Sequence, residues 1–269
     1  MGRLYQLMSE QAQFWEDSWD TGPSAARSPI LGASYGLFNP PRPAKDQFLP
    51  PLPVPSPELL QIGFDWRRAN QKRLELAGNV LAQNNELLDL LDTNILQVQF
   101  NRYNLEVYLS IAGLYRQNLI MLQDLGRIYD ALTAAEQAAG KAEAQKAMAE
   151  LDRAIDIAEN VRQQRNEALQ NAANTWYRTW FPRVAQANGR SYLNVVDDVK
   201  DHQPVRTVDM SYLVYRELHY PLGDWVHKTM EVRNQYAKHN KLRDRSFGFN
   251  WQDASSVVTT QRTPDESTD

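Results

Sequence analysis

The sequence contains no cysteine, which excludes disulfides, thiolate metal sites and cysteine nucleophiles. It also lacks a basic excess, since 29 Lys and Arg residues stand against 33 Asp and Glu, a net charge of −4. Phosphate contacts need basic side chains, so we set nucleic-acid binding aside. No apolar run approaches the roughly 18 residues of a membrane-spanning helix. The first residues have no signal-peptide pattern, although a signal could have been lost if the chain begins inside a longer protein.

The common catalytic motifs are also missing. There is no G-x-S-x-G elbow, no H-E-x-x-H pair, no Walker loop and no G-x-G-x-x-G turn. The four histidines, which we interpret as surface or capping residues, are scattered: His202, His219, His227 and His239. We therefore predict no catalytic residue, no cofactor and no metal ligand in this chain.

Proline dominates the segment before the main body of the chain, with eight prolines between Pro40 and Pro57. Such a segment is neither a helix nor a central strand, because proline fixes φ and has no N–H to donate. Its apolar side chains predict a strap that packs on the body, and not a free linker: Phe38, Phe48, Leu49, Leu52 and Val54. A short amphipathic helix is expected before it, over residues 3–19.

The chain changes character after Gly63, where good helix formers replace proline. Apolar residues then recur at alternating steps of four and three, a heptad-like seam with one polar member: Val107, Ile111, Leu114, Asn118, Met121, Leu125, Ile128, Leu132 and Ala135. A second stripe includes Leu105, Ala112, Leu119 and Leu122, so this helix should pack against two partners. A single helix from Phe64 to Gly140 would be improbably long, and we expect a break at Leu90–Asn94 or at Asn101.

Gly140 is expected to mark the turn into a further helix that ends before Pro182. The polar stretch Asn160–Glu167 should face solvent. A last helix is predicted from about Asp209, kinked by Pro221, after a connection with one short helix. No useful strand-like alternation appears. The prediction is an all-α bundle of long antiparallel helices over residues 64–248, preceded by the helix and strap (1–63) and followed by a polar tail (249–269).

Two polar groups of residues leave alternatives open. Asp197, Asp198 and Asp201 could serve as general acid and base or hold a cation, but in a connection they are more typical of helix caps. The stretch Asn101–Glu106 predicts either a buried polar network or the start of a helix.

Aromatic residues form the most concentrated signal in the sequence. They fit either the core at one end of the bundle or a face that binds a ligand or a protein, because Tyr and Trp combine apolar area with a polar tip. The candidate face, with three charged residues at its rim, is Trp176, Trp180, Tyr212, Tyr215, Tyr220, Trp225, Arg178, Arg216 and Glu217.

Three stretches together carry a family resemblance: residues 22–60, residues 97–119 and residues 174–225. They resemble the C-terminal region of large secreted bacterial proteins related to β-N-acetylhexosaminidases, which are similar to glycoside hydrolase family twenty and have an α/β barrel with a helical extension. The Asp-Glu catalytic pair of that family has no counterpart here, and Pro264–Glu266 lacks its context. The resemblance implies an upstream catalytic barrel as partner, a possible carbohydrate ligand and a periplasmic or secreted location.

Two functions follow as expectations. The first is a non-catalytic helical module, the C-terminal part of a larger carbohydrate-active enzyme. The alternative is a free-standing helical module for protein–protein interaction, with the proline arm as a ligand for a partner. A small enzyme with an unrecognised site at the aromatic end is a third and weaker reading.

Overall fold

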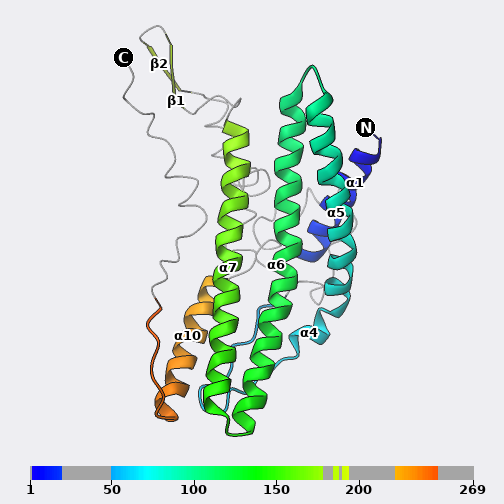
Figure 1. The fold of residues 1–269 in the computed structure, drawn as a ribbon. Helices are drawn as coiled ribbons and strands as arrows, with labels where there is room; N and C mark the ends of the chain where they lie inside the picture. Colours follow the sequence, from blue (N-terminus) through cyan, green and yellow to red (C-terminus); the bar gives the residue numbers. More distant parts are fainter. Residues whose placement is uncertain (1, 20–49, 178–183, 188–189, 194–221, 248–269) are drawn as a thin grey trace, which may run out of the picture.

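The computed structural model describes residues 2–19, 50–177, 184–187, 190–193 and 222–247, and this part of the chain is mainly helical. Its helices and strands run in the following order: α1 (Gly2–Trp19), α4 (Trp66–Ala69), α5 (Gln71–Gln97), α6 (Arg102–Gly140), α7 (Ala144–Tyr177), β1 (Val184–Ala187), β2 (Arg190–Leu193) and α10 (Leu222–His239). The long helices α5, α6 and α7 lie side by side, α10 packs against one half of α7, and α1 lies beside α5 (Figure 1). The predicted all-α bundle is confirmed.

The α6–α7 hairpin forms the centre of the bundle. The predicted seam of α6 is buried from Leu114 to Ala135, whereas Val107 and Ile111 are half-buried. Small side chains let two helix backbones approach closely, and alanines from both helices are buried in the main core: Ala131, Ala135, Ala138, Ala147, Ala154 and Ala158. The heptad pattern therefore identified a buried face of α6, and the small alanines favour close packing of α6 and α7.

The break between α5 and α6 falls at residues 98–101, which agrees with the second of the two predicted positions. Asn101 adopts a left-handed conformation with φ 57° and ψ 29°. Asparagine tolerates this conformation better than most residues. Its side chain makes no capping hydrogen bond, so the backbone preference of asparagine, and not capping, explains its place here.

The turn after α6 differs in detail from the prediction. Gly140 is the last helical residue, but the left-handed residue is Ala142, with φ 60°. The N–H of Glu143 donates to the Ala138 carbonyl at 2.9 Å and that of Ala142 to Ala139 at 2.9 Å, which is the Schellman pattern. A similar pair of bonds follows α10, where Lys241 has φ 56°. The two turns satisfy helix-end carbonyls without glycine at the left-handed position.

The described part of the proline-rich segment packs on the bundle, as predicted. Leu52 and Leu60 belong to the main core. The indole N–H of Trp66 donates to the Pro50 carbonyl at 2.8 Å, and that of Trp225 donates to the Pro53 carbonyl at 2.9 Å. We call residues 50–63 the strap from here on. Two helices therefore hold it through backbone carbonyls, the only main-chain groups that proline can offer.

One part of the strap prediction was wrong, and another part concerns residues that the structure does not describe. Val54 is exposed, whereas Leu52 and Pro55 are buried. The spacing of three between the buried residues matches the three residues per turn of polyproline II, in which Val54 lies on a different side from both. Phe38, Phe48 and Leu49 lie outside the described residues.

Two predictions were wrong. The polar stretch 160–167 does not face solvent throughout, since Val161 and Arg165 are buried. The stretch after α7 contains an antiparallel hairpin, in which Val184 pairs with Leu193 and Ala187 with Arg190. The Asn188-Gly189 pair between these strands is the sequence signal for a two-residue hairpin turn.

The predicted face of the last helix is confirmed within α10, where its members are buried: Leu222, Trp225, Thr229, Val232 and Tyr236. The expected start near Asp209, the kink at Pro221 and the polar tail 249–269 lie outside the described residues. Within the described ranges, no helix has the length and apolar character to cross a membrane.

Leu125→Ala should lower the free energy of unfolding by about 2–5 kcal/mol, since Leu125 is fully buried in the main core and truncation leaves a cavity. Urea denaturation would measure the loss. Leu96→Ala, at an exposed site of α5, is the control and should change stability by less than about 0.5 kcal/mol. Similar small effects at both sites would contradict the assigned register of α6.

Candidate functional site

Most of the predicted aromatic face lies outside the described residues. This applies to Trp180, Tyr212, Tyr215, Tyr220, Arg178, Arg216 and Glu217. Trp176 lies in the last turn of α7, but its side chain is not described. Trp225 is the one member whose side chain the structure describes.

Trp225 is a core residue that contacts the strap. It is buried in α10 among the main cluster of apolar side chains, and its indole N–H donates a hydrogen bond to the Pro53 carbonyl. It therefore does not form the open wall of a groove. The core interpretation applies to this residue, and the binding interpretation of the other members stays a prediction.

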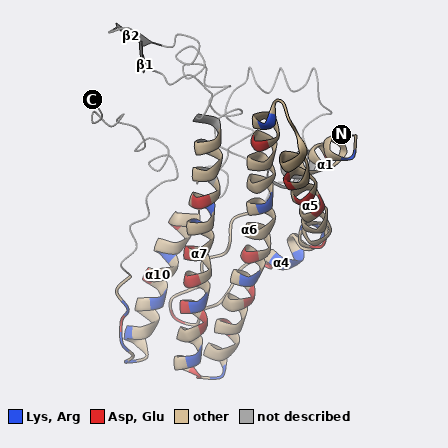
Figure 2. Ribbon diagram, turned by 45° about the horizontal axis from the view of Figure 1, so that its top comes forward, with Lys and Arg blue, Asp and Glu red and all other residues tan. Residues whose placement is uncertain are grey.

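The end of the bundle near Tyr177 carries exposed apolar side chains that the sequence analysis did not single out. Leu96, in the last turn of α5, is 83% exposed, and Phe100, three residues after the end of that helix, is 79% exposed. The loop 98–101 that joins α5 to α6 has no charged residue (Figure 2). Because α6 and α7 are antiparallel, α7 ends at the same end of the bundle as this loop (Figure 1). We call Leu96, Phe100 and the loop 98–101 the tip.

A sequence signal for the tip was present. Phe100 directly precedes Asn101, which was one of the predicted break points, and a break between two antiparallel helices lies at an end of the bundle. The polar stretch that follows is the start of α6, as one of the two interpretations predicted. Arg102 there forms an exposed ion pair with Glu106 at 3.0 Å.

A buried polar contact lies instead on α5. Asn84 is fully buried, and its Nδ2 donates to Gln11 Oε1 at 3.1 Å and to the Ala112 carbonyl at 3.0 Å. Gln11 Nε2 donates in turn to the Val80 carbonyl at 3.1 Å. One amide thus links α1, α5 and α6.

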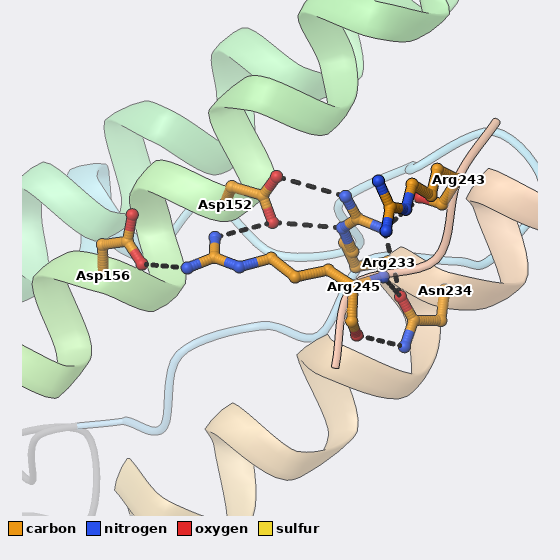
Figure 3. Close-up of polar contacts among 6 residues, drawn as sticks. All are labelled: Asp152, Asp156, Arg233, Asn234, Arg243 and Arg245. Carbon is orange, nitrogen blue, oxygen red and sulfur yellow. Dashed lines mark hydrogen bonds and ion pairs between the residues drawn. The ribbon is translucent and has the colours of Figure 1, made fainter. Parts of the chain in front are cut away.

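An ionic cluster fastens the chain after α10 to α7 (Figure 3). Arg233 is 5% exposed and makes two bonds to the Asp152 carboxylate, at 3.1 and 3.2 Å. Arg245 bridges Asp152 and Asp156 at 3.1 Å each. Arg233 also donates to the Arg243 carbonyl at 3.0 Å. The cluster satisfies a buried guanidinium and fixes residues 243–245, which is a structural role.

The electrostatics of two groups follow from their surroundings. Burial acts to lower the pKa of Arg245, but the charges of Asp156 and Asp152 outweigh it and raise the pKa. Burial raises the pKa of Asp124 on α6, and the neighbouring Arg127 opposes the change only partly.

The remaining candidates from the sequence are placed as follows. His227 and His239 are exposed on α10, as expected of surface histidines. The residues His202, His219, Asp197, Asp198 and Asp201 lie outside the described residues. Among the side chains that the structure describes, no group of three or more His, Asp or Glu is arranged to hold a metal ion.

Asp152→Asn should destabilise the protein by about 1.5–3 kcal/mol, because it leaves the buried Arg233 without its carboxylate. Asp224→Asn is the matched control: its pair with Lys228, at 2.7 Å, is exposed and should contribute at most about 1 kcal/mol. Urea denaturation of both variants would measure the difference. Equal losses would show that the Asp152 cluster contributes no more than a surface pair.

Asp124→Asn should stabilise the protein at pH 7. The folded state holds the Asp124 proton more tightly than the unfolded state, so the stability that this proton contributes is lost as pH rises above the usual value of 3.8. The gain from the variant should therefore shrink as the pH is lowered toward 3.8.

Thermal unfolding from pH 3.5 to pH 8 would follow this change. Asp89→Asn is the control, because it makes the same change at an exposed position of α5 and measures its effect on stability without burial. A gain that stays constant with pH, or a loss at pH 7, would contradict the assigned role of burial at Asp124.

No family model, curated protein or solved structure matches this chain.

Proposed function

We propose that this chain is a non-catalytic helical module, the C-terminal part of a larger carbohydrate-active enzyme related to β-N-acetylhexosaminidases, and that it binds the neighbouring catalytic module through the tip. The observation that carries the docking step is the exposure of Leu96 and Phe100 at one bundle end. The link to hexosaminidases rests on the resemblance of the three sequence stretches alone.

Exposed apolar residues are common singly, but neighbouring ones at one end of a molecule are typical of a contact surface. Leu96 and Phe100 lie four positions apart along the chain, and the loop between them and α6 carries no charge that would favour solvent. Phenylalanine and leucine are also side chains that a partner can cover without having to satisfy a hydrogen bond. These features support binding at the tip.

The position of the tip supports the same proposal. The helix that carries Trp176 and Tyr177 ends at the same end of the bundle. Tryptophan and tyrosine are residue types that are enriched at protein interfaces. The opposite half of the bundle is occupied by the strap, α10 and the ionic cluster.

A free-standing interaction module remains the alternative function. It was expected to present the proline arm to a partner, but residues 50–63 are held against Trp66 and Trp225. This half of the arm therefore offers its carbonyls to the bundle itself, which favours the first proposal over the second. The reading frame upstream of Met1 separates them: a continuous frame that encodes a barrel supports the first, and a promoter with a ribosome-binding site directly before Met1 supports the second.

The docking step is tested with a double variant, Leu96→Asp and Phe100→Asp. If the tip binds the upstream module, the charges should weaken the association at least about tenfold, a loss of about 1.4 kcal/mol. Isothermal titration calorimetry of the two separately produced parts would measure it. Leu76→Asp, at an exposed site of α5 away from the tip, is the control. Equal affinities for the wild-type chain and the double variant would exclude the tip as the docking surface.

A further inference from the structure

Helix α1 lies in a groove formed by α5 and α6. Arg3 pairs with Glu86 at 2.6 Å, whereas Gln11 bonds to Val80 and Asn84. Residues later in α1 thus contact residues earlier in α5, so the two helices are antiparallel. Leu4 and Leu7 are buried in this groove, in one cluster with Leu87, Leu91, Ile95, Leu105 and Ala112.

The groove also offers a polar contact to the helix that it binds. Asn84 is fully buried and directs its amide at Gln11, one turn beyond the buried Leu7. A helix without an amide or other acceptor at that position would leave a buried N–H donor unsatisfied, which is unfavourable. The groove is therefore suited to an amphipathic helix with leucines at two positions three apart and an amide four residues later, which is a helix-in-groove mode of binding.

The contact of α1 is separate from the main core. The residues that α1 covers form their own cluster, while α7, α10 and the strap share the other one. Release of α1 would therefore expose the smaller cluster and leave the main core packed. This separation allows an open form of the chain in which the groove is vacant but the rest of the bundle persists.

Residues 20–49 join α1 to the strap. A chain of about 30 residues can span up to roughly 100 Å when extended, so its length does not confine α1 to the groove of its own copy. A second copy of this protein carries the same helix and the same groove. Reciprocal exchange between two copies would fill both grooves and close the assembly with two-fold symmetry.

We propose that α1 exchanges between two copies of this chain, so that α1 of each copy occupies the α5–α6 groove of the other. The contacts in the exchanged dimer are the same as those within one copy, so the equilibrium between monomer and exchanged dimer depends on protein concentration. A helix tethered to its own groove meets that groove at an effective concentration of the order of millimolar. The exchanged dimer is therefore expected to accumulate as the chain concentration approaches that value. This inference does not depend on the proposed function.

The lack of native cysteine permits a direct test. One chain carries Arg3→Cys and a second, larger tagged chain carries Glu86→Cys. The replaced ion pair is exposed and should contribute little to stability. The two are mixed at about 1 mM, warmed below the unfolding temperature and joined with a bismaleimide, because paired Arg and Glu side chains link Cα atoms farther apart than a disulfide can. Exchange should produce a heterodimer on a denaturing gel, at least about fivefold more than in a dilute mixture at about 10 µM, because the dimer forms by mass action.

The control replaces Glu86→Cys by Lys228→Cys, an exposed position on α10 that reports random collision. Light scattering of the wild-type chain over the same concentrations provides an independent measurement. A dimer fraction that rises with concentration, together with a heterodimer yield above the Lys228 control, supports exchange. A monomer at every concentration, or a heterodimer yield equal to that of the control, overturns it.

Discussion

The close pairing of α6 with α7 is the interaction on which the rest of the structure depends. Buried alanines on both helices let the two backbones approach, and the seam from Leu114 to Ala135 fills the space between them. The paired helices then offer apolar surface on their outer sides. Helices α5 and α10 and the strap cover that surface, so the packing of each depends on the α6–α7 hairpin.

Polar groups decide where these covering elements lie. Apolar contact alone is non-directional, whereas the indole N–H groups of Trp66 and Trp225 can reach only particular carbonyls of the strap. Asn84 similarly sets the position of α1, and Arg233 sets the position of the chain after α10. These directional bonds give one arrangement of the covering elements, and they leave the tip as the part of the described surface with the most exposed apolar side chains.

The helical class, the buried face of α6 and the packing of the proline-rich segment on the bundle were predictable from the sequence, whereas the break before α6 was left open between Leu90–Asn94 and Asn101. These features follow from local rules, namely the helix period and the missing N–H of proline. The family resemblance and the aromatic face were also read from the sequence, and they remain predictions that concern mostly residues outside the described part. The hairpin could also have been predicted from its Asn-Gly pair, but it was not.

Which polar residues are buried, and what they bind, depends on contacts between elements far apart in the chain. Arg165 sits in a stretch that looks solvent-facing, and Arg233 and Asn84 look like ordinary surface residues of amphipathic helices. Their burial depends on a second element that is 28 residues away in the case of Asn84 and Ala112, and 81 residues away in the case of Arg233 and Asp152. Local periodicity cannot report such contacts, because it describes one helix and not the partner that covers it. The exposure of Leu96 and Phe100 was decided in the same way, by the absence of a covering element among the described residues.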